Sequence, residues 1–406
     1  MTSRPRIHFT ATSGWINDPH GLSVVDDRYH LFFQHVPAST VWSPACRWGH
    51  AVSDDLVCWR EQPVALEPGD GDDGVWSGSI ARDDDLGPRA YYTSVHVPDF
   101  GIGRVRVARP TDPDWTHWVK EAVVVDLPPE LDAIAFRDPF VFRDAGCWRM
   151  LVGTALSDGT AAAASFSSPD GRTWAYDGIA ASRSGAQTDP VWTGTLWECP
   201  QMFTVDGRDV LVTSVWDDDV LHYVVYATGR WEDGRFRPDT WRRLTYGESY
   251  YAPSFFRDRQ GRPCLVFWMR GALDEQAGWA GAHSVAYCLS MVDGELVMRV
   301  HPEVEAAVRA WEPDAPLLTQ WRPTDGDLRI GDGSGATTVL HRTSTGIRVQ
   351  QKDGASITLP VAPTTTIALV VDGPIVEVCC GTCGFAVAAG TDLDVRVLDP
   401  APSATP

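Results

Sequence analysis

The sequence is poor in lysine and asparagine, and it has no long apolar run. Arginine provides 32 of its 34 basic residues, and asparagine occurs once in 406 residues, at Asn17. No stretch approaches the roughly 18 apolar residues that a membrane span requires, and residues 1–10 do not resemble a signal peptide. We therefore expect a cytoplasmic protein that does not enter a membrane. Because Asn17 resists a strong bias against asparagine, we expect this position to have a specific task.

Basic residues are also too few to balance the acids, and this imbalance excludes several kinds of partner. The formal net charge is −20. A protein of this charge repels polyanions, so we expect neither nucleic acid nor an anionic membrane as a partner. Hydrophobic residues make up 44% of the chain, as in folded globular proteins. A length of 406 residues favours one large domain and a smaller one.

The cysteines form no pattern that indicates disulfides or a metal site. There are nine of them, an odd number spread along the chain, unlike a secreted disulfide framework. Cys380 and Cys383 form one C-x-x-C motif beside Cys379, but a structural zinc site would need a second pair or histidines at matching spacing. We therefore expect reduced thiols, ordinary strand or turn positions for these three residues, and neither a metal ion nor another cofactor.

Sustained helical periodicity is scarce, whereas short β-branched and aromatic runs are frequent. Clusters of Gly, Asp and Pro, such as Asp70–Gly74 and Glu232–Gly234, separate these runs. This pattern predicts an all-β fold. The runs that we expect to be strands are Tyr29–Phe33, Val105–Ala108, Phe140–Phe142, Val210–Val215, Leu221–Tyr226 and Cys264–Trp268.

A tight turn after a short aromatic or polar approach recurs five times. The five segments are Trp15–Pro19, Trp76–Ser79, Phe136–Pro139, Trp197–Pro200 and Tyr250–Pro253. Counted from Asp18, Ser77, Asp138, Glu198 and Ala252, successive repeats are 54 to 61 residues apart. A four-stranded propeller blade needs on the order of 40–60 residues. The spacing therefore predicts a five-bladed β-propeller in residues 1–305, with the polar residues of the repeats at a central channel; coincidental spacing of β-hairpins is the alternative.

The composition changes in the last quarter of the chain. After about Trp311 the aromatic density falls, and Thr, Val, Gly and Asp dominate. We expect residues 311–400 to form a small β-sandwich-like domain. The runs expected to be its strands include Gly346–Gln350, Ser356–Leu359, Thr366–Val371 and Val395–Leu398.

Two aspartates stand in tight turn motifs where they could do chemistry. Glycoside hydrolysis, for example, needs two carboxyl groups in different protonation states. Asp18 lies in Gly14–Gly21 beside Asn17, whose amide can hydrogen-bond a ligand hydroxyl. Asp138 follows Arg137, which can keep it ionised. Taken alone, each aspartate is better explained as a residue that forms a turn.

Glu198 is the third candidate carboxylate. It lies between Trp197 and Cys199, ahead of an apolar stretch. An apolar setting favours the protonated carboxyl that a general acid needs. Structural pairing of a buried glutamate is the alternative explanation for this residue.

Together these motifs closely resemble glycoside hydrolase family 32, the family of invertases, levanases and inulinases. Three segments are similar to its WMNDPNG, RDP and EC motifs: Trp15–Gly21, Phe136–Pro139 and Trp197–Pro200. Further segments match in order: Tyr29–Gln34, Trp48–Trp59, Trp76–Ser79, Trp279–Leu289 and Asp293–Leu296. The resemblance covers about residues 6 to 305, and it implies a five-bladed propeller followed by a β-sandwich.

The resemblance also implies an activity and residue roles. The chain would be a retaining β-fructofuranosidase that releases terminal fructosyl residues from sucrose or fructo-oligosaccharides. Asp18 would be the nucleophile and Glu198 the general acid/base, while Asp138 would bind fructose hydroxyls with Arg137 beside it. Cys199 would act on Glu198. The remaining residues implied to bind substrate are Trp15, Asn17, Gln34, Trp42, Trp76, Ser77 and Trp268.

The sequence departs from the family pattern mildly in the first motif, and at Ser249 in a way that would change contacts with the leaving group and so the specificity. Ile16 and His20 replace the common Met and Asn of the first motif, and Ser249 stands where the family often has an acid. The C-terminal part is shorter than the family's usual sandwich. Three alternatives therefore stay open: a fructosyltransferase that uses the same intermediate, a related glycosidase acting on arabinosides, and a propeller that binds sugar without catalysis.

Overall fold

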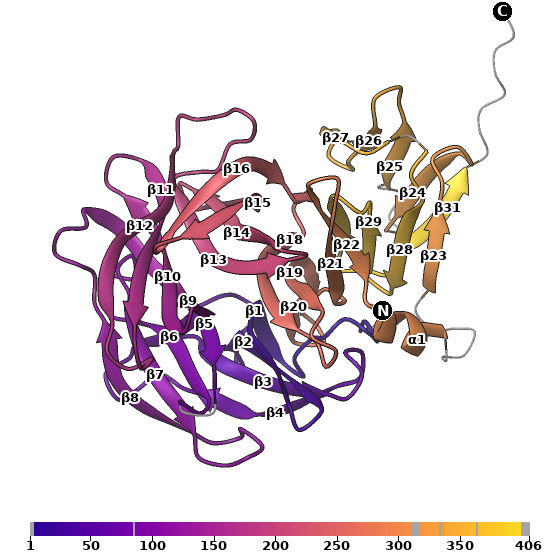
Figure 1. Cartoon of the computed structure of the whole chain (residues 1–406). Helices are drawn as coiled ribbons and strands as arrows, with labels where there is room; N and C mark the ends of the chain where they lie inside the picture. The colour runs from indigo at the N-terminus through magenta and orange to yellow at the C-terminus, as the bar shows by residue number, and fades with distance from the viewer. Residues whose placement is uncertain are drawn as a thin grey trace, which may run out of the picture.

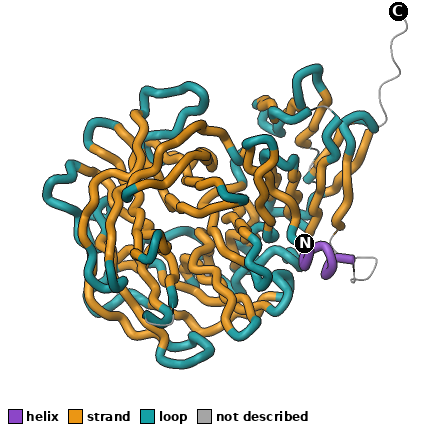
Figure 2. Tube along the Cα trace, viewed as in Figure 1, coloured by secondary structure: helices purple, strands orange, loops and turns teal. Residues whose placement is uncertain are grey.

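The computed structural model of the chain describes residues 4–83, 86–309, 317–332, 335, 337–362 and 364–398. Within these residues the regular structure is almost entirely strand, and α1 (Pro302–Arg309) is the one helix. The expectation of an all-β fold is confirmed (Figure 2). Every run expected to be a strand overlaps one. No helix in the described part of the chain is long and apolar enough to cross a membrane.

Three antiparallel sheets have four strands each, and in each sheet the strands follow one another in chain order. Tight turns join many neighbouring strands, as at Asp206 and Gly207, where positive φ values suit a two-residue hairpin. The strands are β5 (Gly74–Ala81), β6 (Arg89–Val95), β7 (Arg104–Pro110) and β8 (Trp118–Val125); β9 (Ala133–Asp144), β10 (Cys147–Leu156), β11 (Thr160–Ser168) and β12 (Ala175–Ser184); and β13 (Leu196–Val205), β14 (Arg208–Asp217), β15 (Val220–Glu232) and β16 (Arg235–Arg243).

A nine-stranded sheet joins the beginning of the chain to residues 250–300. Its strands are β1 (Gly14–Val25), β2 (Arg28–Val36), β3 (Arg47–Ser53), β4 (Trp59–Leu66), β18 (Tyr250–Arg257), β19 (Pro263–Asp274), β20 (Trp279–His283), β21 (Tyr287–Val292) and β22 (Glu295–Val300). The connection is β20, which pairs in parallel with β1 and antiparallel with β19. Gly281 of β20 has a φ of 85°, and an added Cβ would lie 2.0 Å from the carbonyl oxygen of Ile16. Only glycine permits so close an approach of two strands.

Apart from β20, the nine-stranded sheet consists of two groups of four strands, β1–β4 and β18, β19, β21 and β22. With the three four-stranded sheets this makes five groups, and the first strand of each lies toward a common centre. β1, β5, β9, β13 and β18 contact one another in that order, and β18 also contacts β1. Figure 1 shows the sheets spread around this centre. Hydrophobic clusters fill the space between neighbouring sheets, as where Val105 and Val107 join Met150 and Val152 in one cluster. Because the inner strands form a closed ring, residues at corresponding points of different sheets can meet in one place.

Two five-stranded sheets form the remainder of the described chain (Figure 1). One contains β17 (Thr245–Tyr246), β23 (Leu317–Trp321), β28 (Ile367–Asp372), β29 (Ile375–Cys379) and β30 (Gly384–Ala388), and the other contains β24 (Asp327–Gly331), β25 (Thr337–Arg342), β26 (Ile347–Gln350), β27 (Ser356–Leu359) and β31 (Asp394–Leu398). Their shared core includes Leu328 and Leu340 from one sheet and Leu369 and Val376 from the other. Trp311, residues 312–316 and residues 399–400, at the ends of the expected second domain, lie outside the described residues.

A buried ionic network joins the N-terminal segment to both parts of the molecule. Nδ1 of His8 lies 2.8 Å from Asp372 Oδ2, and its Nε2 lies 2.7 Å from Glu377 Oε1. The hydroxyls of Tyr250 and Tyr287 donate to the other oxygen of Glu377 at 2.6 and 2.8 Å. Burial lowers the pKa of His8, but its hydrogen bonds to Asp372 and Glu377 outweigh burial and raise the pKa to about 9.

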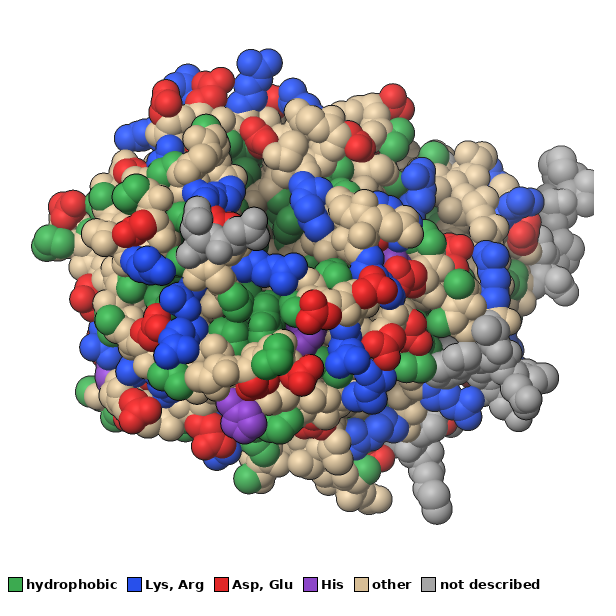
Figure 3. Space-filling view, turned by 60° about the horizontal axis from the view of Figure 1, so that its bottom comes forward, with side chains coloured by type: hydrophobic (Ala, Val, Ile, Leu, Met, Phe, Trp, Pro, Cys, Tyr) green, Lys and Arg blue, Asp and Glu red, His purple; other side chains and the backbone are tan. Residues whose placement is uncertain are grey.

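Charges of both signs are interspersed on the face shown in Figure 3, and hydrophobic side chains gather near its middle. The acidic excess of the chain is therefore not concentrated in a single block on this face. All nine cysteines are unpaired. Cys379 ends β29, and Cys380 and Cys383 bracket the turn that leads into β30, so the prediction of strand and turn positions is confirmed.

Candidate active site

A β-bulge interrupts each of the five inner strands near its motif. Strand pairing shifts register between Ile16 and Pro19, Trp76 and Gly78, Arg137 and Phe140, Glu198 and Gln201, and Tyr251 and Ser254. Neighbouring side chains of a regular strand point to opposite faces, but a bulge re-aims them. Consecutive residues such as Asn17 and Asp18, or Arg137 and Asp138, can therefore line one cavity.

The bulges also define which residues of the repeats are equivalent. The residue before proline has a positive φ in three of them: Asp138 (64°), Cys199 (48°) and Ala252 (41°). Cys199 rather than Glu198 thus corresponds to Asp138, so the equivalence that we drew from sequence spacing is wrong by one position. Glu198 corresponds instead to Arg137, and Tyr251 occupies this position in the fifth motif.

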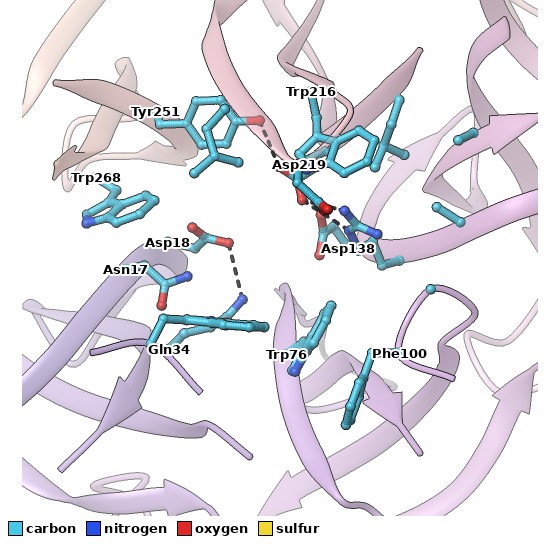
Figure 4. Close-up of a pocket in the computed structure, with 18 of the residues that line it drawn as sticks. Asn17, Asp18, Gln34, Trp76, Phe100, Asp138, Trp216, Asp219, Tyr251 and Trp268 are labelled. Atoms are coloured by element: carbon cyan, nitrogen blue, oxygen red, sulfur yellow. Dashed lines mark hydrogen bonds and ion pairs between the residues drawn. The ribbon is translucent and has the colours of Figure 1, made fainter. Parts of the chain in front are cut away.

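The inner strands surround a cavity of about 620 Å³. Ten residues that the sequence predicted for the site line this cavity: Trp15, Asn17, Asp18, Gln34, Trp42, Trp76, Arg137, Asp138, Glu198 and Trp268. Two others, Ser77 and Cys199, are buried and contact Asp18. Figure 4 shows side chains from several strands converging on the same space. The three candidate carboxylates therefore meet although they are far apart in sequence.

Asp18 is held from the β2 and β5 side of the cavity. Its Oδ2 accepts hydrogen bonds from Ser77 Oγ at 2.7 Å and from Gln34 Nε2 at 3.2 Å. Gln34 also donates to Ser77 at 2.6 Å, so the three groups form a fixed triangle. Burial and the charge of Glu198 raise the pKa of Asp18, while hydrogen bonds from Ser77 and Asn17 act in the opposite direction.

Glu198 is bound by Arg137 and Tyr251. Nε and Nη2 of Arg137 donate to its Oε1 at 3.1 and 2.7 Å, and the Tyr251 hydroxyl donates to its Oε2 at 2.7 Å. The guanidinium of Arg137 lies 5.9 Å from the ring centres of both Trp76 and Trp216. The prediction that Glu198 lies in an apolar setting is therefore wrong. Trp197, which precedes Glu198 in the sequence, does not line this cavity. Charged and polar donors surround the carboxylate instead.

Asp138 lies deeper, and its carboxylate does not bind Arg137. Its Oδ2 accepts a hydrogen bond from the Cys199 backbone N–H at 3.0 Å. Burial and the charge of Glu198 raise the pKa of Asp138 to about 7, although Arg137 lowers it. The expectation that Arg137 keeps Asp138 ionised is thus wrong, since Arg137 pairs with Glu198. Because the carboxylates interact strongly, the proton retained near neutral pH belongs to the cluster rather than to one residue.

Cys199 contacts both aspartates, whereas the resemblance had implied that it acts on Glu198. Its Sγ lies 3.9 Å from Asp18 Oδ2 and 3.7 Å from Asp138 Oδ2. Burial and the neighbouring carboxylates raise the pKa of this thiol well above its ordinary value. Cys199 is therefore a neutral thiol that can donate a weak hydrogen bond to either carboxylate.

Several residues of the cavity were missed from the sequence. Tyr251 had a usable signal, because it stands two positions before Pro253 as Glu198 stands two positions before Pro200. Others have no comparable motif: Phe100, Ile134, Trp216, Asp219 and Leu221. They come from a loop, strand ends and a hairpin turn, and only the closed ring of sheets brings them together.

The cavity holds no cluster of thiols and imidazoles suited to a transition metal among the described residues. Such a cluster lies elsewhere, where one ligand atom each from Cys264, Cys288 and His301 falls within 4.8 Å of the others. His301 is already engaged there, because Nδ1 accepts from the Glu303 backbone N–H at 3.1 Å and Nε2 lies 3.0 Å from Asp258. The charged and aromatic groups that line the cavity are carboxylates, one arginine and several aromatic side chains.

Comparison with known proteins identifies the family. The model described as "Glycosyl hydrolases family 32 N-terminal domain" matches residues 8–301. The chain belongs to glycoside hydrolase family 32. Among curated relatives of this family member, a raffinose invertase of Escherichia coli is 30% identical over 369 residues, which cover 81% of this chain and 76% of the relative. A sucrose-6-phosphate hydrolase of Escherichia coli is 33% identical over 325 residues, 75% of this chain.

The family 32 chain spans less than two thirds of the length of two curated sucrose-6-phosphate hydrolases that it matches. The alignments cover 66% of the Escherichia coli sucrose-6-phosphate hydrolase and 62% of that of Zymomonas mobilis. Solved structures agree in fold over nearly the whole chain. A Bombyx mori family 32 β-fructofuranosidase superposes with a TM-score of 0.82 at 23% identity, over 98% of this chain and 91% of the other. The sucrose-6-phosphate hydrolase of Lactobacillus gasseri gives 0.78 at 21% identity, over 98% and 91%.

Proposed function

We propose that this protein is a retaining β-fructofuranosidase that hydrolyses terminal β-D-fructosyl residues of sucrose or fructo-oligosaccharides. The observation that carries the proposal is the convergence of Asp18, Asp138 and Glu198 in one cavity, each with different partners. Glycoside hydrolysis requires carboxyl groups in unlike environments. Family membership and the names of relatives, raffinose invertase and sucrose-6-phosphate hydrolase, also support it.

In this proposal Asp18 attacks the anomeric carbon of the fructosyl residue. Ser77 and Gln34 fix its carboxylate from one side, so the attacking oxygen has a defined position. Glu198 donates a proton to the leaving oxygen, and an ester forms between Asp18 and the sugar. Glu198 then removes a proton from water, which attacks the same carbon and releases fructose and free Asp18. Tyr251 and Arg137 hold the carboxyl group of Glu198 throughout.

Asp138 has a binding role in the same proposal. It is almost fully buried, and the backbone N–H of Cys199 fixes one of its oxygens. A carboxyl group held in this way can accept hydrogen bonds from vicinal sugar hydroxyls. The neutral thiol of Cys199 contacts both Asp138 and Asp18, so it adds no charge to this pair of acidic groups. Trp76 and Trp268 supply the apolar faces on which a sugar ring packs.

We also infer that the four-stranded groups are the blades of a five-bladed propeller. The closed order of β1, β5, β9, β13 and β18 supports this arrangement. The strand β20 would join the last blade to the first. We propose residues 1–305 as the propeller domain and 311–400 as a small β-sandwich domain, with β17 of the first domain extending one sheet of the second.

The experiment that tests the function is product analysis with the purified protein. Sucrose, raffinose, inulin and levan are incubated separately, and the released sugars are identified by chromatography. We expect fructose from sucrose, with Asp18→Asn losing activity by orders of magnitude and Asp27→Asn, an exposed aspartate after the same strand, retaining it. Longer fructosyl products at high sucrose would indicate transfer, and failure to release fructose from any substrate would contradict the proposal.

A further inference from the structure

The cavity has a second part beyond the carboxylates. Its lining there comes from a loop, the ends of five strands and a hairpin turn, and it includes Phe100, Ile134, Trp216, Asp219 and Leu221. Figure 4 shows Phe100, Trp216 and Asp219 on the side of the space away from Asn17 and Trp268. If fructose occupies the Asp18 side, this part receives the group that leaves.

The wall of this part is largely apolar. Ala135, Ala155 and Leu196 form a small buried cluster against which Trp216 packs. Phe100 stacks on Trp76, with ring centres 6.2 Å apart and planes tilted by 14°. Flat aromatic and aliphatic surfaces of this kind accept the C–H face of an uncharged sugar. They offer few hydrogen-bond donors to an anionic group.

The only cationic side chain among the described lining residues is that of Arg137, and it is already paired with Glu198. It donates twice to Glu198, lies over two tryptophan rings, and its side chain is 11% exposed. A phosphate group would have to draw Arg137 away from Glu198, leaving a partly buried carboxylate without its ion partner. Binding a phosphate would therefore disturb the proposed general acid.

The rim of this part carries a fixed negative charge. Asp218 and Asp219 form the two-residue turn between β14 and β15, and their φ values of 47° and 61° fit a type I′ hairpin. The flanking pair, Asp217 and Val220, is in register, and Thr195 donates to Asp217 at 2.7 Å. The backbone thus holds Asp219 at the cavity.

We propose that the leaving-group side of this cavity selects an uncharged sugar and rejects a phosphorylated one, with Asp219 as a specificity-determining residue. The inference rests on the proposed β-fructosidase function and narrows its substrate class. It separates this chain from the activity named for its sucrose-6-phosphate hydrolase relatives. A phosphate brought near Asp219 and the catalytic carboxylates meets repulsion, and among the described lining residues no cation without a partner offsets it. Binding should therefore weaken roughly tenfold or more.

The test is binding to the full-length Asp18→Asn protein, which should not turn over substrate. Calorimetric titration compares sucrose with sucrose 6-phosphate at constant ionic strength. We expect sucrose to bind at least about tenfold more tightly. A further Asp219→Lys substitution should remove most of this difference, whereas Asp218→Asn, in the same turn but outside the cavity lining, should leave it unchanged.

The outcomes separate this inference from the proposed function. Equal or tighter binding of sucrose 6-phosphate overturns the inference alone, because β-fructosides still bind. An unchanged preference in the Asp219→Lys variant overturns the role of Asp219. Absence of sucrose binding overturns the inference and the proposed function together. Circular dichroism of each variant establishes that the turn substitutions leave the fold intact.

Discussion

Removing one oxygen atom from Tyr251 should slow catalysis without unfolding the protein. The Tyr251 hydroxyl donates to Glu198 Oε2 at 2.7 Å, and it also lies 3.2 Å from the Val215 carbonyl oxygen. Phenylalanine keeps the ring, which packs against Trp268 and under the guanidinium of Arg270. Tyr251→Phe therefore removes the hydrogen bond to Glu198 and the longer contact with the Val215 carbonyl, and it keeps the packing of the ring.

The size of the effect follows from the type of bond. A hydrogen bond to a charged group contributes about 1.5–3 kcal/mol. If Glu198 needs this bond to stay aligned in the transition state, losing it lowers the rate by roughly 10- to 150-fold. The effect should appear in kcat rather than KM, because Tyr251 acts through Glu198 and not through the sugar.

The assay measures initial rates of fructose release from sucrose over a range of concentrations. Tyr223→Phe is the matched control, since the Tyr223 hydroxyl donates to the Trp192 carbonyl oxygen outside the cavity. We expect near wild-type rates for the control. A kcat within about twofold of wild type for folded Tyr251→Phe would refute the reasoning, because that is far below the loss a carboxylate hydrogen bond predicts.

Three further predictions concern pH and thiols. Asp18 must be ionised to attack, and burial together with the charge of Glu198 raises its pKa. As the pH is lowered, kcat/KM should therefore begin to fall above about pH 4, the ordinary pKa of an aspartate. An acid limb at or below about pH 4 contradicts this. Folding raises the pKa of His8 from 6.5 to about 9, so its stabilisation is complete below about pH 6.5 and is lost as the pH rises through 9. Urea unfolding should show a loss of about 3 kcal/mol between these values that is absent in His8→Gln. All nine thiols should react in the denatured, unreduced protein, and a lower number would reveal disulfides.

The local motifs carried most of what the sequence could predict. Asp18, Asp138 and Glu198 each stand in a short segment with proline and an aromatic neighbour, and their spacing indicated that they meet. The strands were predictable for a similar reason, because β-branched and aromatic runs alternate with Gly and Asp turns. Such signals are local, so they can be read directly from short segments of the sequence.

The partners of these residues were not predictable. Arg137 adjoins Asp138 in sequence but binds Glu198, because a bulge turns its side chain along the cavity wall. Asp219 lies at a hairpin tip that looks like an ordinary acidic turn. Its place at the cavity depends on how sheets pack around the centre, and no short sequence pattern records that packing.

The covalent intermediate on Asp18 is the central claim, and its direct test is mass spectrometry of Glu198→Gln with a fructoside that has a good leaving group. Such a substrate needs little protonation, so the first step should proceed while hydrolysis lacks its general base. We predict that the intact protein gains the mass of one fructosyl residue and that peptide mapping locates it on Asp18. Turnover of this substrate with no adduct, or an adduct on another residue, would contradict the account.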